Sequence, residues 1–423
     1  MNARQGTMHD ASVASLSRRN FVKASGGLLI AFSLTDPLSA IAQTAAGDVA
    51  AGPPDAARLD AWIAIHPDNT GTLFTGKVDT GTGIEIALAQ IAAEELDFPI
   101  DRLSVVMGTT SKTIDQGPSY GSRTVRYAGP QIRHAAAAGR QVLLDLAATH
   151  FKLPASQLSA RGGSVFVTGA PARSISYGEL VAGKRLSMTI GASGTAFSMK
   201  VAPGAVLKDP ASYTVVGQSV PRKDIPGKVT GEFTYVQDVK LDGMLHGRVV
   251  RPYGVQADLV SVDESGLKDI PGFVQVVRRG NFLGVVAETE WGAIQAADKL
   301  GSRLNPGGPQ AGQAKWSNWQ GLPVQEKIWD TVRHEPGGDT SVAARGSVDS
   351  ALTSAKKVLK ATYETPFQMH GSIGPSCAVA DVRRNSATFW SGTQMPHQAR
   401  RDMAQLLSMD PEHIELNWLE ASG

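Results

Sequence analysis

Two short loops in the first third of the chain carry residue types that could hold a phosphate. The first follows a strand-like stretch ending at Val78 and precedes the apolar-periodic residues 84–96. A turn of this kind offers backbone N–H groups at the positive end of a helix dipole, which suits an anion. The second loop precedes a long alanine-rich helical pattern in the same way and adds hydroxyls and a guanidinium. Together, the loops could close around one large phosphorylated cofactor. The candidate residues are Gly81, Thr82, Gly83, Ser119, Gly121, Ser122 and Arg123.

The first loop is weak evidence by itself. It is not a dinucleotide-binding fingerprint, because G-x-G-x-x-G would need glycine where Ile86 stands, and no Gly-Lys-Ser/Thr follows as in a P-loop. Glycines between a strand and a helix more often serve the turn alone. The cofactor interpretation therefore depends on the second loop and on the rest of the chain.

The elements that must position these loops alternate between strand and helix, which predicts one α+β domain. We expect residues 186–212, which are polar and poorly periodic, to be a crossing linker. The expected elements are a hairpin of strands 62–65 and 71–78, a helix over 84–96, a strand over 103–107, a helix through 128–146 and a closing strand over 165–167.

Two further units are predicted downstream. In the second, residues 301–320 are rich in Gly, Pro and Gln and indicate a loop. In the third, a hairpin turns at Arg384-Asn385, and the last strand has no predicted partner, which indicates a half-built domain. The expected elements are strands over 244–252, 259–263, 273–277 and 282–287, a helix over 290–300, strands over 358–363, 377–380 and 387–390, a helix over 398–407 and a strand over 414–419.

Composition narrows the class of protein. At 423 residues, two or three domains are expected, and 42% hydrophobic with 19% charged residues is ordinary for a globular chain. A net charge of +2 without basic runs argues against a nucleic-acid partner. The single cysteine, Cys377, excludes a disulfide framework and an iron–sulfur cluster held by this chain alone, and we expect it to be a buried strand residue.

The N-terminal segment has the three parts of an export signal. Ser17-Arg18-Arg19-Asn20-Phe21-Val22-Lys23 is a twin-arginine motif, an apolar stretch covers 24–34, and Ala40-Ile41-Ala42 is a small-residue cleavage pattern. The apolar run is too short for a membrane anchor. The alternative is a chance Arg-Arg pair before a buried helix. The motif predicts a signal peptide over 1–42, export of the folded protein to the periplasm, and a flexible lead-in over 43–59.

Several motifs in register make the chain resemble the molybdopterin-binding large subunits of the xanthine dehydrogenase and aldehyde oxidase family. The exported subtype, with subunits like those of isoquinoline oxidoreductase and nicotinate dehydrogenase, is the most similar. V-G-Q-S-V-P-R and P-G-K-V-T-G-E-F-T-Y-V-Q-D-V within 213–300 resemble the family's α/β hammerhead domain. Q-M-H at 368–370 and W-S-G-T-Q-M-P at 390–396 resemble the start of its first cofactor-binding domain. Residues 76–140 resemble a piece of the second, in the permuted order of the isoquinoline-type subunits.

The resemblance implies an α+β fold with a permuted molybdopterin-binding segment, a hammerhead domain and the start of a further molybdopterin-binding domain. The implied domains are the signal peptide 1–42, the lead-in 43–59, the molybdopterin-binding segment 60–185, the linker 186–212, the hammerhead-like domain 213–300, a loop or insertion 301–345 and the incomplete molybdopterin-binding domain 346–423.

The resemblance also implies roles for single residues. The 119–123 loop would touch the pterin and its phosphate, and Thr82 stands where relatives have a cofactor-binding glutamine. Gln368 would hydrogen-bond an oxo ligand of the metal, with His370 and Gln394 also at the cofactor. The structural alternatives are a strand-end side chain, a packed core histidine and a turn residue, respectively. The pterin would hold the molybdenum, with no metal ligand from the protein.

The implied function is hydroxylation of an N-heteroaromatic compound or an aldehyde with oxygen from water. The cofactor would be molybdenum–molybdopterin, in the cytosine dinucleotide form. Electrons would leave through a small two-iron two-sulfur subunit, with a membrane-bound cytochrome as a further acceptor. The resemblance implies a catalytic glutamate in a Gly-Glu context, which is expected beyond Gly423; Gly178-Glu179 and Gly231-Glu232 do not match that context. Two alternatives stay open: a truncated fragment that binds cofactor or partner without turnover, and a plain periplasmic binding protein.

Overall fold

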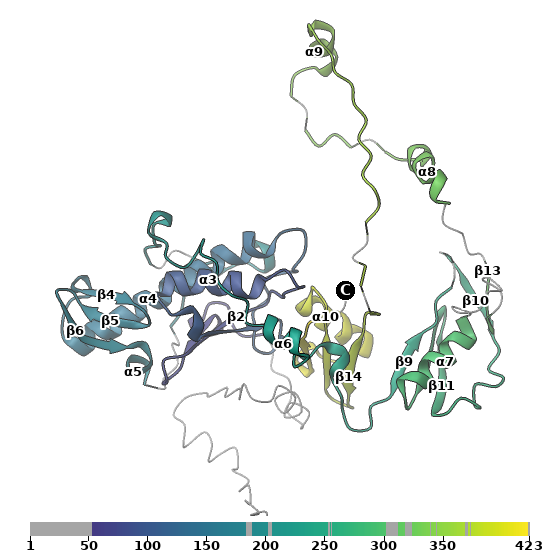
Figure 1. Ribbon diagram of the computed structural model, residues 1–423, viewed down its shortest axis with the longest axis horizontal. Coiled ribbons are helices and arrows are strands. Elements are labelled where there is room, and N and C mark those ends of the chain that lie inside the picture. The colour runs from purple at the N-terminus through teal and green to yellow at the C-terminus, as the bar shows by residue number, and fades with distance from the viewer. Residues whose placement is uncertain are drawn as a thin grey trace, which may run out of the picture. The chain divides into compact units, whose positions relative to one another are not determined.

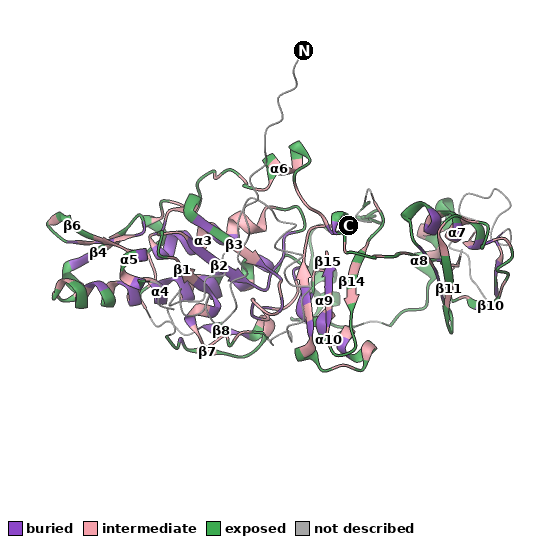
Figure 2. Ribbon diagram, turned by 90° about the horizontal axis from the view of Figure 1, so that it is seen from below, coloured by how far each residue is buried: buried purple, intermediate pink, exposed green. Residues whose placement is uncertain are grey.

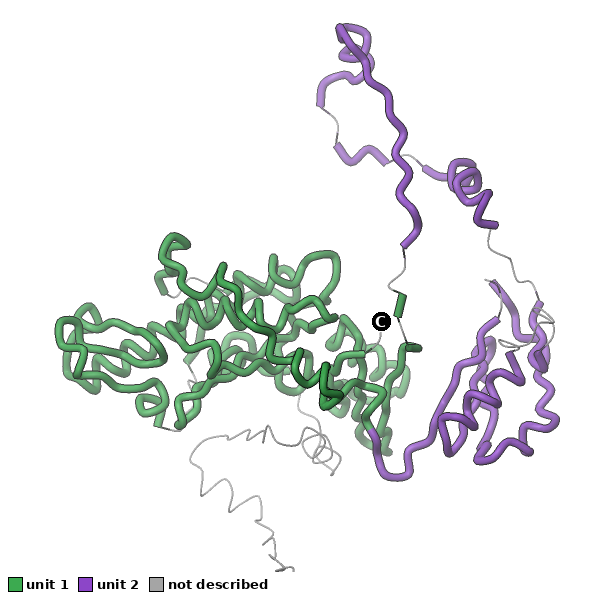
Figure 3. The backbone as a smooth tube through the Cα atoms, viewed as in Figure 1, with its two compact units in different colours: residues 1–239, 369–423 green, residues 240–368 purple. Residues whose placement is uncertain are grey.

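The computed structural model forms two compact units, residues up to 239 together with 369 onward, and residues 240–368 (Figures 1 and 3). The predicted signal peptide lies outside the described residues. No described helix is long and apolar enough to cross a membrane. The structure describes residues 53–182, 188–201, 205–252, 254, 256–301, 312–317, 324–338, 340–343, 345–368, 371–372 and 374–421.

The core of the first unit is a three-stranded sheet with two long helices. Strand β2 pairs antiparallel with β1 and parallel with β3, and helix α3 makes the crossover between β2 and β3. A parallel pair needs such a crossover, and α3 buries its apolar face in the same cluster as the sheet. The predicted hairpin, strand 103–107 and both helices are confirmed. The bounds are β1 Ile63–Ile65, β2 Gly71–Thr75, α3 Ile84–Leu96, β3 Leu103–Met107 and α4 Gly129–Phe151.

Helices α3 and α4 pack closely because of a glycine. A Cβ added at Gly139 would lie 3.3 Å from Leu96 Cδ2, so a larger residue would require the Leu96 side chain to shift. Both helices are largely buried on their facing sides, shown purple in Figure 2. The start of α4, and with it the second loop, is thus held at a fixed place beside α3.

The predicted strand over 165–167 is confirmed as part of β5 Ser164–Val167, which pairs with β4 Leu158–Arg161 and β6 Ala170–Ser176 in a second sheet of this unit. The expectation that residues 186–212 form a crossing linker is wrong for their described part, which packs into the core of the first unit. Its Ile190, Met199 and Val201 lie in the unit's hydrophobic core. Two-residue strands, β7 Ala192–Ser193 and β8 Lys200–Val201, are too short to leave a periodic signal in the sequence.

The first unit continues beyond the expected domain boundary at 213. Helix α6 Ile225–Thr230 follows residues 214–216, which are hydrogen-bonded to α3, and Val236 is fully buried. The compact unit therefore ends at 239, within the segment expected to be hammerhead-like.

The C-terminal part of the first unit is a three-stranded sheet with one helix. The predicted hairpin of β14 Ala378–Val382 and β15 Ala387–Ser391 is confirmed. Helix α10 Pro396–Leu407 then leads to β16 Ile414–Trp418, which pairs parallel with β15. The expectation that this last strand lacks a partner is wrong, because the helix carries the chain back to the same hairpin.

The second unit has one sheet in the order β11-β12-β9, covered by helix α7 Glu290–Gly301, and a separate pair, β10 with β13. The strand expected over 358–363 is wrong: these residues are extended and exposed, and make no strand pairing among the described residues. The mixed helix-and-sheet class is confirmed. The remaining bounds are α5 Tyr177–Val181, β9 His246–Val249, β10 Asp258–Val262, β11 Phe273–Arg279, β12 Phe282–Ala287, β13 Ala314–Ser317, α8 Ile328–His334 and α9 Val348–Ser354.

Candidate functional site

The two predicted loops are neighbours in space. The backbone N–H of Val78, just before the first loop, donates to Ser119 Oγ at 2.9 Å. The Nζ of Lys77 donates to the carbonyl oxygens of Gly117 at 3.0 Å and Pro118 at 2.8 Å. The prediction that both loops lie in one region of the fold is confirmed, because the end of β2 holds the start of the second loop.

A residue near the other end of the chain joins this loop. The N–H of Ser119 donates to the carbonyl of Gln394 at 2.9 Å, and Gln394 Nε2 donates back to the carbonyl of Ser119 at 3.0 Å. The sequence predicted both residues as cofactor neighbours, and they lie side by side. One amide hydrogen bond of Gln394 is thus structural, and its Oε1 is the atom that could still accept from a ligand.

The segment between β3 and the second loop is also fixed to the C-terminal sheet and helix. Asp115 Oδ2 accepts from Arg401 at 2.9 Å, and Thr113 Oγ1 lies 3.3 Å from His397 Nε2. A Cβ added at Gly108 would lie 2.7 Å from the Trp418 Cβ, and this glycine has a φ of +59°. Close approach and a left-handed backbone therefore both require glycine here.

The first loop differs from expectation. The carboxylate of Asp79, which is 4% exposed, already binds its backbone N–H groups. Its Oδ1 accepts from Thr82 at 2.8 Å and Gly83 at 3.1 Å, and its Oδ2 accepts from Glu85 at 3.0 Å. The expectation of free N–H groups for a phosphate at this helix end is wrong, because the chain supplies its own anion. What stays open is the side of Gly81, where an added Cβ would meet nothing within 4 Å.

Replacing Asp79 by alanine should lower the free energy of unfolding of the first unit by about 2 kcal/mol, since three N–H groups at the start of α3 lose their acceptor. Urea unfolding followed by far-ultraviolet circular dichroism measures this. Asp79→Asn keeps one oxygen and should lose less. An alanine variant as stable as the unmodified protein would show that the cap contributes nothing.

The second loop has the donor set of an anion site. Gly121 and Ser122 have left-handed backbones, with φ of +63° and +57°, and both are exposed. The exposed Arg123 places its guanidinium 5.0 Å from the ring centroid of Phe197 and 5.9 Å from that of Tyr120. A single π-helical stretch, 124–128, follows; such stretches are frequent at functional sites. Hydroxyls, turn N–H groups and a guanidinium suit a phosphate.

A buried chain of amides supports both loops, and sequence reasoning missed it. Gln116 Oε1 accepts from Thr75 Oγ1 at 2.6 Å and from the N–H of Gly76 at 3.0 Å. Gln116 Nε2 donates to Gln131 Oε1 at 2.8 Å, and Gln131 Nε2 donates to the carbonyl of Met199 at 3.0 Å. Because each polar group is partnered, the chain fixes the end of β2 against α4.

The described part of the structure does not test the remaining predicted cofactor residues. Gln368 is exposed and belongs to the second unit, so its cofactor role stays a prediction. His370 lies outside the described residues. Cys377, expected to be buried in a strand, is half-buried and immediately precedes β14.

Two charged side chains near the second loop, Lys77 and Asp115, have shifted pKa values. Burial lowers the pKa of Lys77 to about 8, which the charge of Asp115 partly opposes and that of Arg123 reinforces. Burial alone would raise the pKa of Asp115, but the Gly117 N–H, His397 and Arg401 outweigh it and hold that pKa below its usual value. Among the described residues, no group of three or more His, Cys, Asp or Glu side chains could hold a metal ion.

The exposed guanidinium of Arg123, the left-handed residues 121 and 122 and the open side of Gly81 form an arrangement that could hold an anionic group. Residues 38–265 match the model of a molybdopterin cofactor-binding domain, and residues 333–420 match a second model of the same description. The chain belongs to the molybdopterin cofactor-binding domain family.

Curated relatives agree with this assignment. The chain is 37% identical over 416 residues to a nicotinate dehydrogenase subunit of Pseudomonas putida, covering 96% of this chain and 32% of that protein. It is 26% identical over 446 residues to the beta subunit of isoquinoline 1-oxidoreductase of Brevundimonas diminuta, covering 95% and 54%. It is 26% identical over 421 residues to membrane-bound aldehyde dehydrogenase [pyrroloquinoline-quinone] of Gluconacetobacter polyoxogenes, covering 95% and 51%. The chain thus spans 32–54% of these relatives, and the resemblance stated from its motifs is confirmed.

Proposed function

We propose that this chain is the molybdopterin-binding part of a molybdenum hydroxylase that oxidises an N-heteroaromatic compound or an aldehyde. The relatives named for nicotinate, isoquinoline and aldehyde support this substrate class. The observation that carries the proposal is the pair of hydrogen bonds between Ser119 and Gln394, which joins segments from the two regions that match cofactor-binding models.

The residues fit an anionic pterin cofactor. Bound molybdopterin would supply the molybdenum through which oxygen and electrons are exchanged. Arg123, with the left-handed Gly121 and Ser122, would hold the phosphate end of a cytosine dinucleotide form. The open side of Gly81 would let the cofactor approach the backbone, and Gln394 Oε1 would accept a hydrogen bond from it. Gln368 and His370 stay in the proposal as further cofactor neighbours.

The general base would be a glutamate. Glu179 does not fit this role, because its carboxylate accepts from the Ser176 N–H at 3.0 Å and from Ser176 Oγ at 2.6 Å, which completes a capping box of α5. We also propose a hammerhead arrangement for residues 213–300 and a permuted domain order. These follow from the motif resemblance and from the order of the two matched regions.

Partners and location are part of the same proposal. The relatives' names include subunits, which supports assembly with other chains. Electrons would pass to a small two-iron two-sulfur subunit and then to a membrane-bound cytochrome. The twin-arginine motif supports export of the folded, cofactor-loaded protein to the periplasm.

A second candidate is favoured by the length of the match. The chain spans only 32% of the nicotinate dehydrogenase subunit, so it could bind cofactor or a partner subunit without turnover. The two candidates differ in activity and agree in cofactor binding.

The test is the metal and nucleotide content of the full chain, purified from cells that make molybdopterin. We expect molybdenum, a pterin and cytidine monophosphate in equal amounts. Arg123→Met should reduce cofactor occupancy about tenfold, because a charge-assisted contact to phosphate is lost. The matched control is Arg161→Met, an arginine that also stacks on a ring, Phe166 at 5.5 Å, outside both loops.

The outcomes separate the candidates. Molybdenum-loaded protein that oxidises nicotinate, isoquinoline or an aldehyde supports the hydroxylase, and loaded protein without activity supports the binding fragment. Protein that lacks molybdenum and carries pyrroloquinoline quinone, the cofactor in the third relative's name, would contradict both.

A further inference from the structure

A fully buried ammonium lies beneath the second loop. Lys77 is 0% exposed, and its Nζ donates to the carbonyl oxygens of Gly117 and Pro118. Taking a lysine out of water is costly unless its donors are used, and burial accordingly lowers the pKa of this residue. An apolar residue would fill the same space without that cost, so the position uses the charge.

An aromatic ring completes the surroundings of this ammonium. Lys77 Nζ lies 4.7 Å from the ring centroid of Phe197, and the guanidinium of Arg123 lies 5.0 Å from the same centroid. The ring belongs to a short 3-10 turn, residues 196–198, in the segment expected to be a linker. A Cβ added at Gly117 would lie 3.3 Å from this ring, so the loop starts in contact with it.

We propose that Lys77 and Phe197 are positioning residues that fix the backbone of residues 117–123. With both carbonyls before Ser119 held by one ammonium, the two peptide planes that lead into the loop are fixed. Ser119 then meets Val78 and Gln394, while the ring fixes the guanidinium of Arg123. The inference rests on the proposed function only in giving this loop a cofactor to bind, since the order of the loop is a property of the chain itself.

The experiment compares Lys77→Met with the unmodified full chain, without added cofactor. Methionine keeps the length and apolar stem and removes both donors. We expect tryptic cleavage after Arg123, and hydrogen exchange of residues 117–123, to become about tenfold faster or more, because two charge-assisted hydrogen bonds are lost. The thermal midpoint should change little, because removing a buried charge offsets part of the lost bonding.

Two further variants complete the experiment, one as a control and one as a second test of the same proposal. Lys200→Met removes an exposed lysine beside the same turn and should leave the cleavage rate unchanged. Phe197→Leu keeps the hydrogen bonds of Lys77 and removes the ring, so it should accelerate cleavage after Arg123 even where the Lys77 variant does not fold.

Each outcome has one meaning. Faster cleavage confined to the loop, with lower molybdopterin occupancy, supports the inference. Faster cleavage with unchanged occupancy supports the positioning role and contradicts the cofactor role of the loop. Unchanged cleavage in both variants, or a fall in the thermal midpoint that accounts for all of the added cleavage, would overturn the inference.

Discussion

Replacing Glu94 by alanine should lower the free energy of unfolding of the first unit by about 4 kcal/mol, because a buried charge network loses its central acceptor. Glu94 lies near the end of α3 and is 1% exposed. Its Oε2 accepts from three successive backbone N–H groups, of residues 214–216, at 2.9, 2.6 and 3.1 Å. Its Oε1 accepts from Lys208 Nζ at 3.2 Å.

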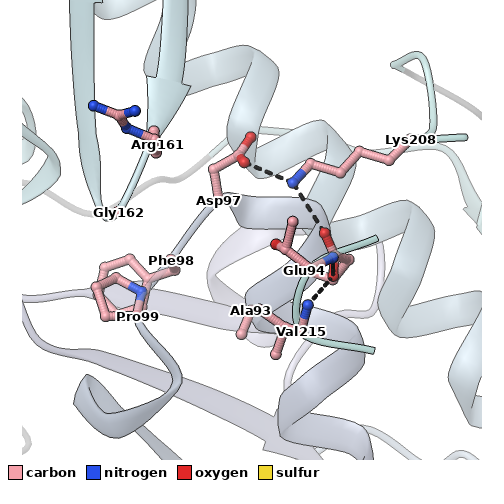
Figure 4. A pocket seen from close by; sticks show the side chains of 10 residues that line it. Ala93, Glu94, Asp97, Phe98, Pro99, Arg161, Gly162, Lys208 and Val215 are labelled. Atoms are coloured by element: carbon pink, nitrogen blue, oxygen red, sulfur yellow. Dashed lines mark hydrogen bonds and ion pairs between the residues drawn. The ribbon is translucent and has the colours of Figure 1, made fainter. Parts of the chain in front are cut away.

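The same carboxylate borders a cavity of about 250 Å³, which Asp97, Lys208 and Arg161 also line (Figure 4). Burial alone would raise the pKa of Glu94, but the three N–H groups and Lys208 outweigh it and hold that pKa below its usual value. The folded-state pKa is depressed, so this stabilisation is present above pH 4.5 and is lost as the pH falls below it.

Urea unfolding, together with tryptic cleavage after Lys208, measures the effect. Glu94→Gln keeps an acceptor and should lose less than alanine. Gln90→Ala is the matched control, since its amide reaches the same segment by neutral hydrogen bonds to the carbonyls of Val215 and Gln218. We expect a loss of about 1 kcal/mol there. If Gln90→Ala and Glu94→Ala lost equal free energy of unfolding, the negative charge of Glu94 would not be what stabilises this segment.

Acidification from pH 6.5 to 4 should cost the unmodified protein about 3 kcal/mol more stability than it costs His397→Gln. Burial lowers the pKa of His397 from 6.5 to about 4; the charge of Asp115 opposes this shift, while Arg400 and Arg401 reinforce it. The folded state keeps the imidazole neutral, whereas the unfolded chain binds a proton below pH 6.5. Stability from this group is therefore complete above pH 6.5 and falls until about pH 4.

The measurement is the free energy of unfolding of the unmodified protein and of His397→Gln at several pH values. The difference between the two proteins reports this histidine alone, because the carboxylates that titrate in the same range are present in both. Parallel curves for the unmodified protein and His397→Gln would mean that the imidazole is protonated equally in both states.

Local patterns in the sequence predicted most elements of the first unit, but they could not predict which strands distant in the sequence pair with one another. The apolar period of 84–96 and the alternation around Pro67 each act within one stretch of chain. The first gave the bounds of α3, and the second gave the hairpin, although β2 ends at Thr75 rather than at 78. The partner of β16 and the separate sheet of β5 depend on contacts that no window of sequence contains. The exposed residues 358–363 carry a strand pattern without a neighbouring strand among the described residues.

In the candidate site too, residues marked by a local sequence pattern could be predicted, and residues defined by contacts between distant segments could not. Loop residues such as Ser119 and Arg123 were found because glycine, hydroxyl and guanidinium groups cluster in sequence. The role of Asp79 was missed because this residue stands four positions before Gly83, the N-cap of α3, whereas the capping pattern concerns the N-cap position itself. Lys77 and Phe197 could not be predicted, because the ring that the lysine meets lies in a different segment.

The 275-residue separation between Ser119 and Gln394 has a consequence for biosynthesis. At a translation rate of about 5–20 residues per second, the ribosome needs roughly 15–55 s to make the second partner after the first. The whole second unit emerges during that interval, while the first unit is still unfinished. Cofactor loading that depends on both partners must therefore be a late event, after nearly all of residues 1–423 have left the exit tunnel.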